Sequence, residues 1–531
     1  EMTSSLVGSE MCIRDRWRRY AVNVRKSVKR LGKNAGREKP LKKQKPQRKL
    51  RLPRKSMKIN IEKFGRVFQL SFGVVFIFVL FSCAVRGYFS YGLTWQIAVI
   101  AAAALGTLWA ARKGYLLLDG RLTERRADAV FFVLAVLMLA AQLYCGYRLS
   151  FAPITDLGYT DRAARAFCVD WDVSAISDSL PARHKNYFAI YPNNQALLIL
   201  LALLYKAQYL LTGSMTRAVP IFVNVVALNC SYVFMYKNAK LIFKGSASKP
   251  LFAAVCGFFF SVFYTYTPFY YTDSLSMPFV MLALYAYLRG AESVNAKKYP
   301  SAVLQLSLCA LCVAVGFKIK GSVVVLLVAL SIYSAIRRWE CKRQWAVRTA
   351  VAVGTAAAAL IFIKLLSVGI SAFNIASDAD YERYKFPIQH WIMMGMRSRG
   401  GYSYRDFAYT LSFETYEEKA AAAVTRIAYR FENFGLGGLT LHFFKKAAYT
   451  WTDGSYLIFY HIDGGENSLL RKFITDTSAF RYICEVYHIA MLFAITGGFL
   501  KAYDDKKTKV NDVWLLRIIF VGVFFFFELW E

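Results

Sequence analysis

The sequence predicts an all-α polytopic membrane protein, a bundle of about eleven transmembrane helices. The 531-residue chain is 56% hydrophobic and 16% aromatic, and its mean hydropathy is +0.32. Apolar runs of about 20 residues recur along it, which is the length that crosses roughly 30 Å of hydrocarbon. Only helices and closed barrels satisfy the backbone in lipid, and runs of this length are typical of helices.

The N-terminal segment is basic and precedes the apolar region. Residues 1–66 carry 22 Lys and Arg against 5 Asp and Glu, a difference of +17 and half of the formal charge of +34. We expect residues 1–16 to be translated read-through of a sequencing adapter, with Met57 as a plausible start. Residues 17–66 are expected to form a disordered cytoplasmic tail. Such a tail could bind nucleic acid or anionic lipid, but the positive-inside rule accounts for it with no nucleic-acid partner.

Eleven apolar segments are expected to cross the membrane, because this number leaves every basic loop on one side. Residues 67–531 would then form the transmembrane domain, and its last run stops so abruptly that we expect the C-terminus to be truncated. The predicted crossings are 67–87, 92–110, 128–148, 218–236, 250–270, 274–289, 301–317, 321–336, 345–368, 482–500 and 513–531.

The apolar segment 192–212 is treated differently. It contains three amides at its start and also Lys206 and Gln208. If the Lys-rich loop 237–249 is inside, the order of crossings is consistent only when 192–212 does not cross. We therefore expect a helix lying on the outer interface. Two outer loop regions result, 149–217 and 371–480.

The cysteines and the polar motifs predict neither a disulfide framework nor an obligatory metal. Most of the ten cysteines lie in or beside apolar segments, and Cys309-x-x-Cys312 lies within one, which makes a redox or zinc role improbable. The sequence contains no HExxH motif and no cluster of carboxylates. We therefore predict no cofactor, and leave a divalent cation open.

The first outer loop carries the residues with the clearest chemistry. It begins FAPITDLGYTDRAARAF and ends NYFAIYPNN. Asp156 is the first carboxylate after an outward crossing, where it could act as a general base or cap a helix. Asp161 could bind substrate, but a helix cap or salt-bridge partner is the commoner role for it.

Three motifs together carry a resemblance to a known family. The pattern PITD-x-x-Y-x-x-x-A, the later YPNN and the YTDSLS after a mid-chain crossing resemble GT-C glycosyltransferases. These membrane enzymes are similar to protein mannosyltransferases and the lipid A aminoarabinose transferase. YFAIYPNNQ and PIQHWIMMGM resemble an uncharacterised subgroup from Gram-positive bacteria. The resemblance covers roughly residues 65–531.

The resemblance implies an activity and a set of site residues. Asp156 would be the catalytic base, Asp273 would line the site, and Lys318 or Lys320 would hold the donor phosphate. The donor would be a polyprenyl-phosphate-linked sugar in the bilayer, and the acceptor a cell-envelope glycan, lipid or protein. We expect an inverting transfer at the outer face of a bacterial plasma membrane.

Several further residues are candidates with two interpretations each. Tyr191 could contact substrate or belong to an aromatic belt, and Asn193 and Asn194 could bind a sugar or cap the interfacial helix. His390 could line an acceptor cleft or be a buried structural histidine. Arg183 and His184 could serve the donor phosphate or lie on the surface, as Lys318 and Lys320 could simply snorkel from a helix end.

Two other functions compete with the glycosyltransferase hypothesis. One is a polytopic transporter or flippase of lipid-linked or cell-wall glycans, which would place charged or broken segments at the bilayer midplane. The other is a polymerase or ligase of cell-wall glycans that uses the same donors. The predicted crossings carry few charges at their centres and show no repeat, which favours an enzyme at the interface.

Overall fold

The computed structural model describes residues 61–340, 345–397, 399–462, 468–504 and 512–530. The chain divides into two units, Glu1–Ile61 and Glu62–Glu531, and the description below concerns the second. The predicted adapter segment 1–16 and most of the tail lie outside the described residues. The first helix already begins at Ile61, so the tail ends before residue 66.

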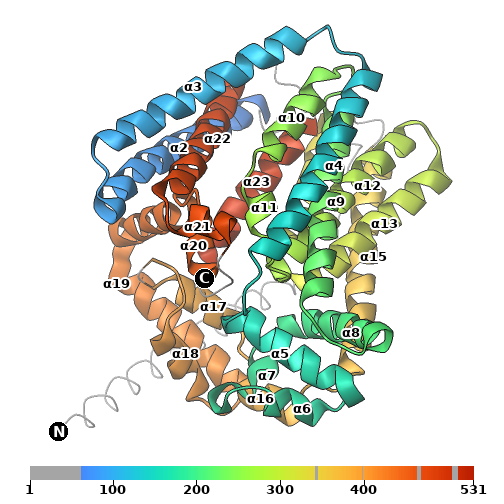
Figure 1. Ribbon diagram of the computed structural model, residues 1–531, viewed down its shortest axis with the longest axis vertical. Helices are drawn as coiled ribbons and strands as arrows, with labels where there is room; N and C mark the ends of the chain where they lie inside the picture. The colour runs from blue at the N-terminus through green and yellow to red at the C-terminus, as the bar shows by residue number, and fades with distance from the viewer. Residues whose placement is uncertain (1–60, 341–344, 398, 463–467, 505–511, 531) are drawn as a thin grey trace, which may run out of the picture. The chain divides into compact units, whose positions relative to one another are not determined.

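The predicted fold class is confirmed, since the structure is 83% helical and the described residues form no strand. The long helices run side by side in Figure 1. They are α2 (Ile61–Tyr91), α3 (Trp95–Leu118), α4 (Glu124–Arg148), α9 (Ala218–Ile242), α12 (Thr272–Asn295), α13 (Tyr299–Ile319), α14 (Val324–Glu340), α15 (Trp345–Ser371), α22 (Ser478–Asp504) and α23 (Asp512–Leu529).

The bundle is apolar both inside and outside, as expected for a protein surrounded by lipid. Its interior holds Phe76 between α2 and α23, and Tyr232 between α9 and α4, both with no exposed surface. Its outer surface exposes Phe81 to 65% and Phe132 to 68%. Contiguous exposed apolar surface of this kind marks a membrane contact.

Eight of the described helices are long and apolar enough to cross a membrane. One of them is Pro192–Thr212, which is predicted not to cross, so seven of the eleven predicted crossings are matched. The predicted crossing 250–270 is unmatched because it is not a continuous helix. It consists of α10 (Ser248–Phe258) and α11 (Val262–Thr265), joined by non-helical residues. The predicted crossing 321–336 is also short: η3 (Gly321–Val323) leads into α14.

The break after α10 is stabilised by amide side chains from neighbouring helices. Asn224 of α9 donates to the carbonyl oxygens of Tyr266, Thr267 and Phe269 at 2.9–3.0 Å. Gln142 of α4 donates to the Phe263 carbonyl at 3.0 Å. Non-helical backbone at membrane depth needs such partners because lipid supplies none. The prediction of a continuous helix over 250–270, which rests on apolarity alone, is therefore wrong.

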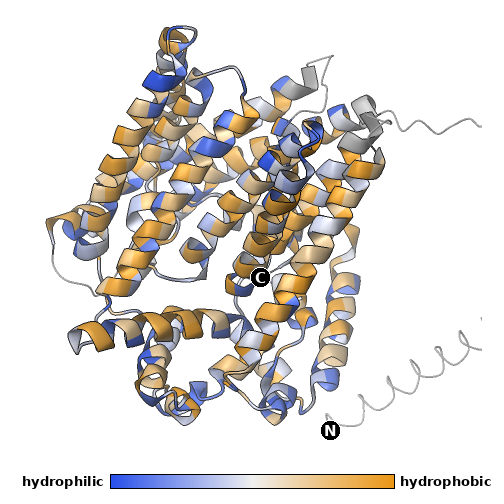
Figure 2. Ribbon diagram, turned by 90° about the vertical axis from the view of Figure 1, so that its right-hand side faces the viewer, coloured by the Kyte–Doolittle hydropathy of each residue, from blue (hydrophilic) through white to orange (hydrophobic). Residues whose placement is uncertain are grey.

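Residues 155–212 form a layer of helices at one end of the bundle, at the bottom of Figure 1. The last of them, α8 (Gln195–Thr212), lies across the direction of the long helices, and an apolar helix runs across the foot of the bundle in Figure 2. Length and composition would also let Pro192–Thr212 cross a membrane. The other elements are α5 (Thr155–Asp170), α6 (Val173–Asp178), η1 (Ala182–His184), α7 (Tyr187–Ile190) and η2 (Pro192–Asn194).

The predicted outer loop 371–480 is mostly helical, and part of it packs into the bundle. Its longest element, α19, bends at Gly435, and the part after the bend packs Ala447 and Trp451 against Phe72 and Phe76 of α2. This region is therefore more than a surface loop. Its elements are α16 (Asp378–Tyr384), α17 (Ile388–Gly395), α18 (Tyr404–Leu411), α19 (Tyr416–Trp451), α20 (Ile458–His461) and α21 (Leu469–Thr475).

Candidate functional site

The start of α5 fixes the position of Asp156. Thr155 has φ +52°, a conformation that β-branched residues seldom adopt, and such strain is concentrated at functional sites. Gly158 lies so close to the chain that a Cβ there would collide with the carbonyl oxygen of Pro153. These two features turn the chain sharply into α5 and leave the Asp156 side chain in the exposed first turn.

Asp156 is exposed to solvent, but neighbouring protein atoms withdraw its carboxylate partly from water. Partial withdrawal from water raises the pKa of Asp156, while a hydrogen bond with Tyr187 and the nearby His184 lower it. The net change is upward, since loss of solvent penalises the charged form. A carboxyl group with a raised pKa is better matched to proton transfer near neutral pH.

Tyr187 connects Asp156 to the rest of a polar network. Asn194 donates from Nδ2 to the hydroxyl oxygens of Tyr187 at 2.6 Å and of Tyr271 at 3.2 Å. Burial, together with Asp156 and neighbouring tyrosines, raises the pKa of Tyr187 well above its usual value, so this hydroxyl keeps its proton and can donate. The network joins α7 and η2 to the start of α12.

The second carboxylate of the site is Asp273, two residues after Tyr271. It forms a 2.5 Å ion pair with Lys320, which follows α13. Burial raises the pKa of Tyr271, and Asp156 and Asp273 both add to this shift, which places the phenol near both carboxylates. Tyr271 is thus the common neighbour of Asp156, Asn194 and the Asp273–Lys320 pair, four residues that the sequence marks separately.

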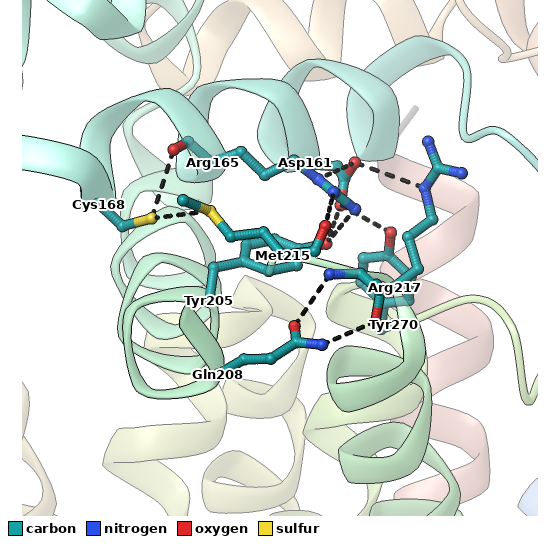
Figure 3. Close-up of polar contacts among 9 residues, drawn as sticks. Asp161, Arg165, Cys168, Tyr205, Gln208, Met215, Arg217 and Tyr270 are labelled. Carbon is teal, nitrogen blue, oxygen red and sulfur yellow. Dashed lines mark hydrogen bonds and ion pairs between the residues drawn. The ribbon is translucent and has the colours of Figure 1, made fainter. Parts of the chain in front are cut away.

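Asp161, on the same helix as Asp156, has a different environment. Its carboxylate accepts hydrogen bonds from Arg165 at 3.1 Å, from Tyr270 at 2.7 Å and from Tyr205, and it pairs with Arg217 at 3.7 Å (Figure 3). Only 2% of the residue is exposed. The substrate-binding role expected for Asp161 does not fit this geometry, whereas the salt-bridge role does.

Comparison with known proteins identifies the family. One family model, described as a conserved hypothetical integral membrane protein, matches residues 164–531. The chain belongs to this family. No characterised protein and no solved structure matches it significantly. The match confirms that the chain is an integral, multi-pass protein of the lipid bilayer, and it includes every residue of the network except Asp156.

The other candidate site residues that the sequence predicts lie in several environments. Tyr191 packs its ring 4.9 Å from Tyr187 and 5.7 Å from Trp391, so it borders the network. Asn193 donates to the side-chain oxygen of Asn194 at 3.2 Å. Lys318 lies in the last turn of α13, and the hydrogen bonds and ion pairs of the described residues do not connect it to the site.

The structure corrects the predicted substrate-binding role of His390. Its side chain has no exposed surface, so it does not line an open acceptor cleft. Its Nδ1 lies 2.6 Å from the Thr410 hydroxyl, and burial lowers its pKa to about 4. Of the two interpretations of His390, the structure supports the buried structural histidine. Arg183 is exposed, and His184 packs its ring 4.4 Å from that of Tyr159.

The sequence does not indicate the contacts of the tyrosines and arginines that complete these clusters. Tyr271 is the first residue of the YTDSLS motif, and that position is its signal in the sequence. Arg165 follows Asp161 by four residues, the spacing of a helical ion pair. Arg217 gave no signal. No group of three His, Cys, Asp or Glu side chains arranged for a metal occurs among the described residues.

Proposed function

We propose that this protein is a membrane glycosyltransferase that moves a sugar from a polyprenyl-phosphate donor to an extracytoplasmic acceptor in bacteria. The observation that carries the proposal is the accessible Asp156 carboxylate, which is hydrogen-bonded to Tyr187. The charges of Asp156 and of Asp273, the partner of Lys320, both act on Tyr271. A carboxylate base and a cation match the acceptor proton and the anionic leaving group of such a transfer. The layer of helices around α8 suits a donor whose tail stays in lipid.

The chemical step uses Asp156 as a general base. The carboxylate takes the proton of the acceptor hydroxyl while its oxygen bonds to the anomeric carbon. The bond from that carbon to the phosphate oxygen breaks on the opposite face, so the configuration inverts and the lipid phosphate leaves as an anion. Lys320 would stabilise that anion electrostatically, exchanging part of its contact with Asp273 for the phosphate.

The neighbouring residues would hold the base in position. Tyr187 can donate its proton to the ionised Asp156, and Asn194 fixes the Tyr187 hydroxyl at 2.6 Å. Such preorganisation keeps the carboxylate aimed at the acceptor. Tyr191 and Trp391, whose rings lie 5.7 Å apart, would offer apolar faces for a sugar ring beside Tyr187.

A second candidate function, transport, is favoured by a different cluster. Arg86 of α2 forms a 3.4 Å ion pair with Asp453, and the nearby Glu485 and His488 of α22 are buried. Ionisable groups in apolar helices often mark translocation pathways. Here Arg86 and Glu485 lie within two turns of their helix ends, which is closer to an interfacial position than to a midplane one.

One experiment separates the two functions. Purified protein in liposomes is incubated with a radiolabelled polyprenyl-phosphate sugar and cell-envelope acceptors, and both labelled product and movement of the donor across the bilayer are measured. The glycosyltransferase proposal requires labelled product that depends on Asp156. Donor movement without product would favour a flippase and overturn the proposal.

A further inference from the structure

A groove between α4 and α9 opens beside the Asp161 cluster. Its volume is about 790 Å³, and its walls include Leu143 and Tyr147 of α4 and Ile221 and Phe222 of α9. It lies on a different side of α5 from Asp156. Five residues along an α-helix correspond to roughly 140° of rotation and ~7.5 Å of rise, which separates Asp161 from Asp156.

The walls of the groove face outward. Leu143 is 41% exposed, Tyr147 72% and Phe222 54%. These residues lie in long apolar helices of an integral membrane protein, so the surface that they expose is in contact with lipid. Tyr147 near the end of α4 is typical of the interfacial level of a bilayer.

The polar end of the groove carries two guanidinium groups but only one carboxylate. Arg165 is held by the protein: it donates to the Met215 carbonyl at 2.7 Å, to Tyr205 at 3.0 Å and to Asp161. Arg217 approaches Asp161 only through Nε, at 3.7 Å. Figure 3 shows the two terminal nitrogens of Arg217 turned away from that cluster. Its side chain is 37% exposed.

We propose that this groove binds an anionic membrane phospholipid, with its phosphate on Arg217 and an acyl chain along the apolar walls. The terminal nitrogens of one guanidinium match two phosphate oxygens, and the excess of positive charge favours an anion. A free phosphate would use Arg217 but leave the apolar walls uncovered. A lipid uses both parts. The proposal does not depend on the glycosyltransferase hypothesis.

Lipid binding to the purified full chain in detergent tests the proposal. Short-chain phosphatidylglycerol is titrated against the wild type and against Arg217→Gln and Ala218→Trp. The first variant removes the charge, and the second fills the groove beside it without changing charge. Arg426→Gln is the matched control, because Arg426 of α19 contacts the ring of Tyr409 of α18 and does not line the groove.

Both groove variants should weaken phosphatidylglycerol binding by about tenfold or more: Arg217→Gln because it removes one charge-assisted contact, and Ala218→Trp because it blocks the place of the acyl chain. The control should bind as the wild type does, and phosphatidylcholine should bind more weakly to the wild type. Unchanged binding in Ala218→Trp, or in a folded Arg217→Gln, would overturn the proposal. So would full competition by inorganic phosphate at equal concentration, because the site would then be one for a free anion.

Discussion

At the scale of single residues, one helix carries two aspartates whose surroundings give them opposite roles. Asp156 keeps an exposed carboxylate beside Tyr187, whereas Asp161 is enclosed by two arginines and two tyrosines. A buried carboxylate with four partners holds the structure together. An accessible one with a raised pKa is available for proton transfer. The assignment of the base therefore follows from environment.

Replacing Asp156 with Asn tests the base directly. The amide keeps the size of the side chain but cannot accept the proton, so transfer should fall by about 10²–10⁴-fold. Donor binding should persist, because Lys320 and the apolar surfaces are untouched. Transfer and donor affinity are measured side by side, with Asp178→Asn in exposed α6 as the control. Near-normal transfer by Asp156→Asn would move the assignment to Asp273.

The pH dependence of transfer provides a second test at this scale. Asp156 acts when ionised, and its raised pKa means that activity should be lost as pH falls through a value above the ordinary aspartate range. Tyr187→Phe removes a hydrogen bond that lowers this pKa, so the acidic limb should shift to still higher pH. The pH profile of kcat/KM for both proteins shows this. An unmoved limb would contradict the positioning role of Tyr187.

A third prediction concerns stability. Asp161→Asn leaves Arg165 and Arg217 without their shared counter-charge, and unfolding should become easier by about 1–3 kcal/mol. The value is below that for a fully buried pair because both arginines are partly exposed and screened by solvent. Thermal unfolding in detergent measures it, again with exposed Asp178→Asn as control. Equal melting temperatures would show that the cluster in Figure 3 adds little.

Part of the candidate site could be predicted from the sequence. Asp156, Asn194, Asp273 and Lys320 each stand near the end of an apolar run, and polar residues there tend to gather at one membrane face. The hydrogen bonds that Asn194 donates to Tyr187 and Tyr271 could not be predicted, because one of them joins residues 77 apart in the chain. The burial of His390 depends on α18, because Thr410 of that helix contacts the imidazole ring.

At the scale of elements, apolar length predicts helices well and their interruptions poorly. The long helices form where uninterrupted apolar runs occur, whereas 250–270 breaks although it is equally apolar. The break is stable because Asn224, in the second turn of α9, donates to three carbonyl groups. An amide side chain in an apolar helix can thus accompany irregular backbone beside it.

The bend in α19 gives a prediction at this scale. Gly435 has φ +55° and ψ −176°, a conformation essentially confined to glycine. Gly435→Ala should therefore destabilise the protein by about 1–3 kcal/mol, although open space surrounds the position. Gly437→Ala is the matched control: it also meets open space but lies in regular helix, so it should be neutral or slightly stabilising. Equal thermal unfolding of both variants would refute the requirement for glycine.

At the scale of the whole molecule, the position of α8 decides the topology. If α8 lies along the outer interface, α5 to α8 and the start of α9 share one side. The basic loops before α4, after α9 and after α12 then lie on the other, as the positive-inside rule requires. If α8 crossed, one set of these loops would be on the wrong side. The direction of α8 across the bundle supports the first arrangement.

Single cysteines in a cysteine-free background test this arrangement. Ala182→Cys precedes α8, Leu211→Cys lies at its end with 85% exposure, and Ala296→Cys lies in the exposed turn after α12. In intact cells, a membrane-impermeant maleimide should label positions 182 and 211 equally and leave 296 unlabelled. Permeabilised cells, in which all three should react, are the control. Labelling of 182 without 211 would show that α8 crosses, which would place the Asp161 groove and α9 in the opposite orientation.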